Sequence, residues 1–280
     1  MDRARRILVL GFVVAACASV SYAQAPAIAP PPPAVVLSPD EMEVFLKTAK
    51  VARRRSSGKG VTAPIRATFT DGRVTHEGQI QTVDEESSVF NAGRASEVNF
   101  KDTYRFNIGG YRLATLLGLR NVPMSVPRRV DNKDAAVTWW IDDVQFDETG
   151  RLKQPKILGP EPDRTSKQIQ IMRIWDELIQ NKDRNQGNIL WTTDWTLWMI
   201  DHTRAFRLGK ELVKPEQLTR CDRSLLEALR RLTLEDVTKA MDGIMRKDEL
   251  EAVMARRDLI VKHFDARIAS RGADLVLFSM

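Results

Sequence analysis

Residues 183–206 are the stretch that most constrains what this chain can fold into. They open with an aspartate and an asparagine in the spacing D-x-x-x-x-N, Asp183 and Asn188. Two short apolar runs follow, separated by the turn-forming residues Thr192-Thr193-Asp194, and the second run ends at Asp201. Apolar runs on either side of such a turn are typical of a β-hairpin. A hairpin of this length would bring Asp201 back beside Asn188, so we expect an amide and a carboxylate to converge, with a second carboxylate a short loop away.

These three groups match what phosphoryl transfer from ATP requires. One aspartate orients the attacking hydroxyl and accepts its proton, while an asparagine and a second aspartate hold the magnesium ions that neutralise phosphate charge. The stretch resembles the catalytic core of the protein-kinase-like superfamily. It is similar to the atypical branch, which holds the phosphoinositide 3- and 4-kinase-like, HipA-like and secreted Golgi-type kinases, in the segments Asp183-Arg184-Asn185, Gly187-Asn188, Ile200-Asp201-His202 and Ala205-Phe206.

The resemblance covers about residues 58–269 and implies a two-lobed α+β fold, with a small β-rich N-lobe and a mainly helical C-lobe. It implies Asp183 as the catalytic base, Asn188 and Asp201 as metal ligands, and Mg²⁺ and ATP as cofactors. The acceptor would be a hydroxyl of a protein, a lipid head group or a small molecule. The spacing D-x-x-x-x-N also occurs by chance, and a plain hairpin loop with acidic caps is the alternative interpretation.

The nucleotide-binding part departs from the family pattern. In atypical kinases a strand of the N-lobe ends in a lysine that holds the ATP phosphates, and the next helix supplies its glutamate partner. The matching positions here hold Gln81 and Asn107. The two changes fit one another, because losing only the lysine would leave a carboxylate unpaired in a cleft, whereas two amides can hydrogen-bond. Either another cation takes over the phosphates, Lys59, Lys101 or Arg105, or the protein is a pseudokinase that binds nucleotide weakly.

Lys59 lies in a glycine-rich segment, Gly58-Lys59-Gly60, which lacks the G-x-x-x-x-G-K-[ST] spacing of a P-loop. It is either a loop over the ATP phosphates or a flexible entry loop. Near the predicted catalytic base, Lys182, Arg184 and Arg204 are candidates for compensating phosphate charge or for pairing with nearby acids. His202 is a candidate third metal ligand, although orienting Asp201 or packing is the more common role.

Local signals give the expected elements. Ser38-Pro39 starts a helix that should run to about Arg53, where three arginines suit the helix dipole. Asp71-Gly72 marks a hairpin between residues 65–70 and 74–83. A helix is expected over residues 101–117, a second hairpin over 124–130 and 135–144, and further helices over 166–181, 224–232, 234–245 and 247–269.

The N-terminus carries an export signal. Arg3, Arg5 and Arg6 precede a short apolar core at residues 7–16, and Ser21-Tyr22-Ala23 offers small residues for cleavage before Gln24. Val14 to Cys17 also resembles a bacterial lipobox, which would make Cys17 lipidated and give the protein its membrane contact. An uncleaved anchor is the third alternative. We expect an exported protein, periplasmic or secreted, with a signal peptide at 1–23, a proline-rich linker at 24–37, a helical segment at 38–57, the N-lobe at 58–145 and the C-lobe at 146–280.

Composition limits the remaining functions. A formal net charge of +6 is too small to indicate nucleic-acid binding without a clustered basic patch. Cleavage would leave Cys221 as the single cysteine, so no internal disulfide is expected and we interpret it as structural. ATP is scarce outside the bacterial cytoplasm, which favours a non-catalytic kinase-like binding module in the envelope as the alternative function. A metal hydrolase that uses the same carboxylates without nucleotide is a third possibility.

Overall fold

The structure, a computed structural model, describes residues 36–56, 65–92, 95–182 and 184–280. Residues Leu37–Met280 form one unit. The predictions for the export signal, the linker, the Lys59 loop and Asp183 lie outside the described residues. No helix within the described ranges is long and apolar enough to cross a bilayer.

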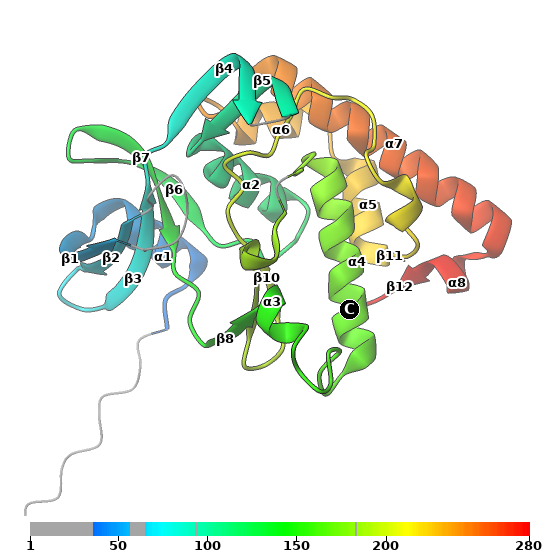
Figure 1. The fold of residues 1–280 in the computed structure, drawn as a ribbon, viewed down its shortest axis with the longest axis horizontal. Coiled ribbons are helices and arrows are strands. Elements are labelled where there is room, and N and C mark those ends of the chain that lie inside the picture. The colour runs from blue at the N-terminus through cyan, green and yellow to red at the C-terminus, as the bar shows by residue number, and fades with distance from the viewer. Residues whose placement is uncertain (1–35, 57–64, 93–94, 183) are drawn as a thin grey trace, which may run out of the picture. The chain divides into compact units, whose positions relative to one another are not determined.

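The N-terminal part is built on an antiparallel sheet of five strands in the order β1-β2-β3-β7-β6 (Figure 1). Its inner face buries Ala67, Phe69 and Ile80 against Phe45 and Leu46 of the first helix. The hairpin at Asp71-Gly72 is confirmed, and Gly72 has the positive φ of 88° that favours glycine. The elements are α1 (Pro39–Thr48), β1 (Lys50–Ser56), β2 (Ile65–Thr70), β3 (Thr75–Gln81), β6 (Ser125–Val130) and β7 (Lys133–Trp139).

The first helix starts as predicted but ends early. Ser38 caps it, and Glu41 completes a capping box. The helix stops at Thr48, and the three arginines that follow lie on β1, so the prediction of a helix to Arg53 was wrong. The physical reason is tertiary: the backbone of β1 pairs with β2, a partner that comes later in the sequence.

A two-stranded ribbon separates the sheet from the next helix. It consists of β4 (Asp84–Ala92) and β5 (Ala95–Thr103), and α2 (Arg105–Leu116) follows. The sequence predicts a helix from Lys101, but Lys101 lies on β5 and the helix begins at Arg105, so the predicted start is wrong. The helix ends as expected near Gly118, which has a positive φ of 72°.

The C-terminal part is mainly helical and holds the largest core, in which Trp175, Leu178, Val253 and Phe264 are fully buried. Cys221 is buried here too, and burial raises the pKa of its thiol, in agreement with a structural role. The elements are β8 (Val144–Asp147), α3 (Glu148–Arg151), α4 (Pro162–Leu178), β9 (Ile189–Thr192), β10 (Leu197–Met199), β11 (Cys221–Asp222), α5 (Arg223–Arg231), α6 (Leu234–Ala240), α7 (Lys247–Arg271), α8 (Ala273–Val276) and β12 (Leu277–Phe278).

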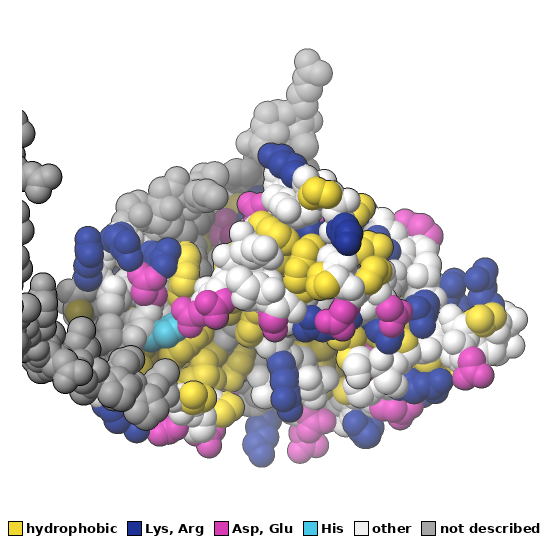
Figure 2. Space-filling model, turned by 90° about the horizontal axis from the view of Figure 1, so that it is seen from below, with side chains coloured by type: hydrophobic (Ala, Val, Ile, Leu, Met, Phe, Trp, Pro, Cys, Tyr) yellow, Lys and Arg dark blue, Asp and Glu magenta, His cyan; other side chains and the backbone are white. Residues whose placement is uncertain are grey.

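Surface charges of both signs are interspersed with hydrophobic side chains on the face shown in Figure 2. Many basic side chains pair with acids, as Arg54 does with Asp131 and Arg55 with Glu77. Arg54 and Arg55 on the edge strand β1 are therefore accounted for by pairing with acids. Exposed charge on an edge strand also opposes edge-to-edge association.

Candidate active site

The predicted hairpin is present and brings Asn188 and Asp201 together. Strands β9 and β10 pair with Met199 opposite Ile189. One step beyond, the N–H of Ile200 donates to the C=O of Asn188 at 3.1 Å. Asp201 therefore follows directly on a residue paired with Asn188, at the open end of the hairpin. The hairpin is confirmed, and it brings the backbones near Asn188 and Asp201 together. The convergence of the two side chains and their roles as metal ligands stay predictions.

Asp201 has an unusual backbone, with φ at +56°, and its side chain is exposed. Aspartate is among the few residues other than glycine that enter this left-handed region readily. The following residue, His202, donates its N–H to Oδ1 of Asn107 at 2.8 Å. The hydroxyl of Thr203 donates to Oδ1 of Asp201 at 3.1 Å. Hydrogen bonds to Asn107 on α2 and from Thr203 thus hold the turn, and Asp201 is exposed to solvent.

Arg184 holds the hairpin to the core. Its guanidinium donates to the carboxylate of Asp176 on α4, with the shortest contact at 3.0 Å. It also donates to the C=O of Asn188 at 3.0 Å and of Ile200 at 2.7 Å. This side chain is nearly buried. Its N–H groups donate to the backbone of Asn188 and of Ile200, the residue before Asp201. Arg184 therefore acts as a structural partner of Asp176 and supports both candidate ligands.

His202 packs inside the protein. Its Nε2 accepts a hydrogen bond from the indole N–H of Trp175 at 3.1 Å and faces Nη2 of Arg184 at 3.2 Å. Burial, and then the charge of Arg184, lower the pKa of His202 well below its ordinary value. A neutral ring whose Nε2 accepts carries its proton on Nδ1. Because Nε2 is engaged in the core, the alternative of a third metal ligand was wrong, and packing is the role that the geometry supports.

The two neutral amides of the N-terminal part are both buried. Gln81 ends β3, and its Oε1 accepts from the N–H groups of Thr82 and Val83 at 3.1 and 3.4 Å. Asn107 lies on α2, where its Oδ1 accepts from His202. Asn107 therefore connects the helix to the Asp201 turn through the backbone, and its predicted part in nucleotide binding stays a prediction.

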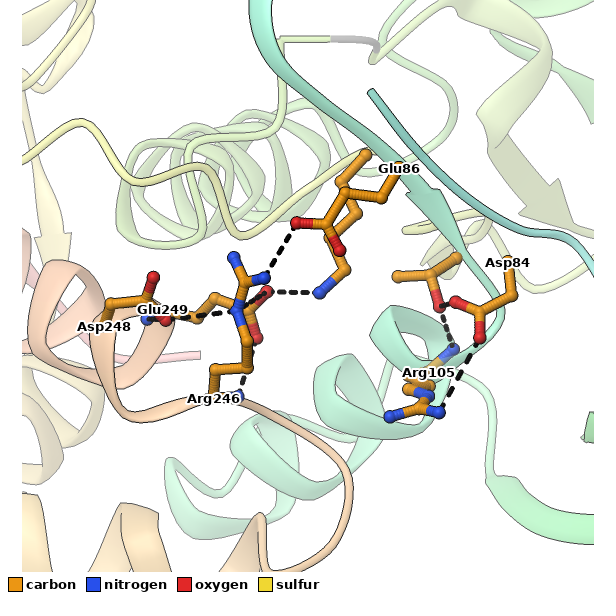
Figure 3. Close-up of polar contacts among 8 residues, drawn as sticks. Asp84, Glu86, Arg105, Arg246, Asp248 and Glu249 are labelled. Carbon is orange, nitrogen blue, oxygen red and sulfur yellow. Dashed lines mark hydrogen bonds and ion pairs between the residues drawn. The ribbon is translucent and has the colours of Figure 1, made fainter. Parts of the chain in front are cut away.

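Two of the candidate replacement cations, Lys101 and Arg105, lie in the described residues, and each pairs with an acid. Figure 3 shows the pair of Arg105 with Asp84 and the acids around Arg246. Nζ of Lys101 lies 2.6 Å from Oε1 of Glu249, a side chain that is only 1% exposed. Arg246, just before α7, pairs with Glu86 of β4 at 2.7 Å. These two pairs join the β4–β5 ribbon to the start of α7. Arg105, the first residue of α2, pairs with Asp84, the first residue of β4, at 3.6 Å.

Sequence reasoning missed one acid near this site, Asp102 on β5. Burial raises the pKa of its carboxyl group, a hydrogen bond with Thr203 opposes that rise, and the neighbouring Asp201 carboxylate adds to it. No local pattern marks Asp102, because it is a single polar residue in a short strand far from Asp201 in sequence. Only the pairing of its strand with the Asp201 turn reveals it.

The oxygen atoms available fit a magnesium-type cation. The amide group of Asn188 makes no hydrogen bond with any described residue, and Asp201 exposes its carboxylate. Within the described ranges, no three side chains among histidine, cysteine, aspartate and glutamate gather as a metal centre. Mg²⁺ does not need three such side chains, since one or two carboxylates together with substrate phosphates and waters commonly bind it.

Comparison with known structures gives the fold. A structure of hydra Fam20 with sugar matches with a TM-score of 0.66 at 13% identity, over 86% of this chain and 92% of that one. The Golgi casein kinase with Mn and ADP bound matches with a TM-score of 0.61 at 15% identity, over 85% and 78%. The proinflammatory kinase CtkA of Helicobacter pylori matches with a TM-score of 0.53 at 12% identity, over 83% and 98%. The chain has a protein-kinase-like fold.

The predicted fold class, a β-rich N-lobe and a mainly helical C-lobe, is therefore confirmed. None of the protein-family models and none of the curated proteins compared with the sequence matches it. At such low identities the structural likeness establishes the fold, and the activity has to be argued from the side chains.

Proposed function

We propose that this protein is an ATP- and magnesium-dependent phosphotransferase that acts on a hydroxyl group of a protein, lipid or small molecule. The observation that carries the proposal is the β9–β10 hairpin, which sets Asn188 beside Asp201 at its open end on a kinase-like fold. Asp183 is proposed as the base that accepts the hydroxyl proton. The proposal also draws on the Golgi casein kinase, whose structure holds Mn and ADP.

The chain's own residues would divide the work as follows. Asn188 and Asp201 would hold the cation, which supplies positive charge to the phosphates when it is bound. Arg184 keeps their backbones in place through Asn188 and Ile200. His202, buried and neutral, adds no charge to the site and fixes the turn by packing against Trp175.

A pseudokinase is the second candidate function, and one observation favours it. The predicted lysine and glutamate positions hold Gln81 and Asn107, and the nearby Lys101 is engaged by Glu249. Nucleotide would then bind without turnover. The export signal that we propose from residues 1–23 points the same way, because it would place the protein where ATP is scarce.

The deciding experiment measures unfolding of the full chain with ATP and either Mg²⁺ or Mn²⁺. A ligand that binds only the folded state at one hundred times its Kd stabilises it by about 2.7 kcal/mol. We expect this stabilisation in the wild type and its loss in Asp201→Asn. Asp131→Asn is the matched control, because Asp131 is also an exposed aspartate with a positive φ, 52°, but lies in the β6–β7 turn.

Phosphate transfer separates the two candidates. Transfer that disappears in Asp183→Asn while nucleotide stabilisation persists would support the phosphotransferase. Stabilisation without any transfer in the wild type would support the pseudokinase. Absence of nucleotide stabilisation with both cations would contradict both, and hydrolysis of a phosphoester by the cation-loaded protein alone would favour the metal hydrolase.

A further inference from the structure

The loop at residues 152–160, which joins α3 to α4 at the lower edge of Figure 1, exposes three large aliphatic side chains. Leu152, Ile157 and Leu158 are 46%, 45% and 37% exposed. Aliphatic side chains that are exposed singly are normal on a protein surface, whereas a group of them marks a surface that contacts another molecule. Three of them in one short loop therefore indicate a contact surface.

The loop is held in one conformation by hydrogen bonds and by the core beneath it. The buried guanidinium of Arg151 donates to the C=O of Ile157, which keeps Ile157 beside the end of α3. Arg151 also pairs with Glu148 at 2.6 Å. Gly159 has a positive φ of 68°, and a Cβ at this position would collide with the ring of Trp195. The exposure of the three aliphatic side chains is thus set by the fold.

Two lysines lie among these side chains, Lys153 and Lys156, and both are exposed. Neither amino group has a hydrogen bond or an ion pair with any residue that the structure describes. The nearby acids at both ends of the loop are already paired, Glu148 with Arg151, Glu161 with Arg164 and Asp163 with Lys167. The loop therefore presents two unpaired positive charges beside three aliphatic groups.

This combination favours an anionic lipid surface over a protein partner. Interfaces between proteins are enriched in aromatic residues, methionine and arginine, and they are depleted in lysine. Residues 152–160 contain two lysines and no aromatic residue, methionine or arginine. At a membrane surface, by contrast, aliphatic side chains enter the boundary of the acyl chains while lysine amino groups reach the anionic head groups.

We propose that the loop at residues 152–160 docks the protein on an anionic membrane surface. Leu152, Ile157 and Leu158 enter the acyl boundary, and Lys153 and Lys156 bind lipid phosphates. The contact is peripheral and reversible, because a few aliphatic side chains bury less apolar surface than a lipid anchor. Since α4 follows this loop and leads toward the candidate active site, docking would orient that site relative to the membrane. The proposal does not depend on the proposed phosphotransferase activity.

The test measures co-sedimentation of residues 24–280 with vesicles of phosphatidylethanolamine and phosphatidylglycerol, and with vesicles of phosphatidylcholine alone. This chain lacks the apolar segment at residues 7–16, which would bind lipid by itself, and it keeps the whole compact unit Leu37–Met280. We expect binding to the anionic vesicles that weakens as salt is raised, and little binding to phosphatidylcholine. No binding to the anionic vesicles, or equal binding to both kinds, would overturn the proposal.

A first pair of variants tests the charges. Lys153→Gln/Lys156→Gln should weaken binding to anionic vesicles about 30-fold, which corresponds to about 2 kcal/mol at about 1 kcal/mol per lysine. Its control, Lys239→Gln/Lys262→Gln, removes the same charge from exposed positions on α6 and α7 and should stay within a few-fold of the wild type. Equal weakening in both variants would contradict docking through this loop, because net charge would then govern binding.

A second pair tests the aliphatic groups. Ile157→Gln/Leu158→Gln should weaken binding at least tenfold, because the transfer of two aliphatic side chains out of water is lost. Its control, Leu234→Gln/Leu275→Gln, replaces exposed leucines on α6 and α8 and should bind like the wild type. Unchanged binding in Ile157→Gln/Leu158→Gln would rule out insertion of the loop. Urea unfolding checks that these surface variants keep their fold.

A polarity-sensitive dye on Ile157→Cys reports insertion directly, because Cys221 is buried and Cys17 is absent from residues 24–280. Its emission should shift to the blue on anionic vesicles, whereas the same dye on Leu275→Cys should show no shift. A dimer in sedimentation equilibrium that Ile157→Gln/Leu158→Gln dissociates would mean that a second copy covers the loop, and would overturn the proposal. ATP stabilisation should be the same in all these variants, so this proposal and the phosphotransferase proposal fail independently.

Discussion

The two sides of the candidate site use their charges differently. On the C-lobe side, the buried pair of Arg184 and Asp176 fixes the hairpin, while Asn188 and Asp201 keep oxygens available. On the N-lobe side, Lys101 is bound to Glu249. One side carries the oxygens of the proposed cation site, whereas the lysine on the other side pairs with an acid and holds the ribbon to α7. Under the proposed function, this difference predicts that nucleotide binding depends on the cation more than on a phosphate-binding lysine.

Breaking the C-lobe network should give the largest effect. Arg184→Met leaves Asp176 as an uncompensated charge and frees the carbonyls of Asn188 and Ile200. Removing one partner of a buried pair costs about 3–5 kcal/mol, so we expect a loss of this size in urea unfolding. The double variant Arg184→Met/Asp176→Leu should recover part of it. A loss below about 1 kcal/mol would show that this network does not hold the hairpin.

The N-lobe ion pair should matter less. Lys101→Met removes one partner of Glu249, but the guanidinium of Arg246 still lies 3.7 Å from that carboxylate and the backbone N–H of Arg246 still donates to it at 2.8 Å. We expect a loss of about 1–3 kcal/mol in unfolding and a nucleotide affinity close to that of the wild type. The control Glu86→Gln breaks the exposed pair with Arg246 while it leaves Arg246 beside Glu249, and it should cost below about 1 kcal/mol. A tenfold loss of nucleotide affinity in Lys101→Met alone would make Lys101 the phosphate-binding cation and erase the contrast between the two sides.

The smallest effect is the acid sensitivity contributed by His202. Its folded-state pKa lies well below the ordinary 6.5 because of burial, so below about pH 6.5 the unfolded chain binds a proton that the folded chain does not. Stability from this group is therefore complete above that pH and declines as the pH falls, by at most about 1.4 kcal/mol per pH unit.

Urea unfolding of the wild type and His202→Gln between pH 8 and pH 5 measures this contribution as a difference in slope. The variant should show the shallower decline, because glutamine does not titrate. Parallel pH profiles would mean that His202 is not buried in its neutral form, and the ordering of the Asp201 turn would need another explanation.

Local signals were sufficient where neighbours in sequence are also neighbours in space. The hairpin that joins Asn188 to Asp201, the turn at Asp71-Gly72 and the cap at Ser38 are all formed by residues close together in the chain. Predictions failed where the secondary structure of a segment depends on a partner strand elsewhere in the sequence. Residues 50–56 look like the end of a basic helix, yet β2 pairs with them. Residues 101–103, which were expected to be helical, form the end of β5 because their backbone pairs with β4.

The sequence by itself determined the hairpin of the kinase-like core, since a fixed spacing and a short turn pair Asn188 with the residue before Asp201. Tertiary structure alone decided what surrounds them. It buried Arg184 and His202 as supports, bound Lys101 to an acid on α7, and carried Asp102 to Thr203. Burial and long-range pairing set these roles, and neither leaves a local pattern in the order of the residues.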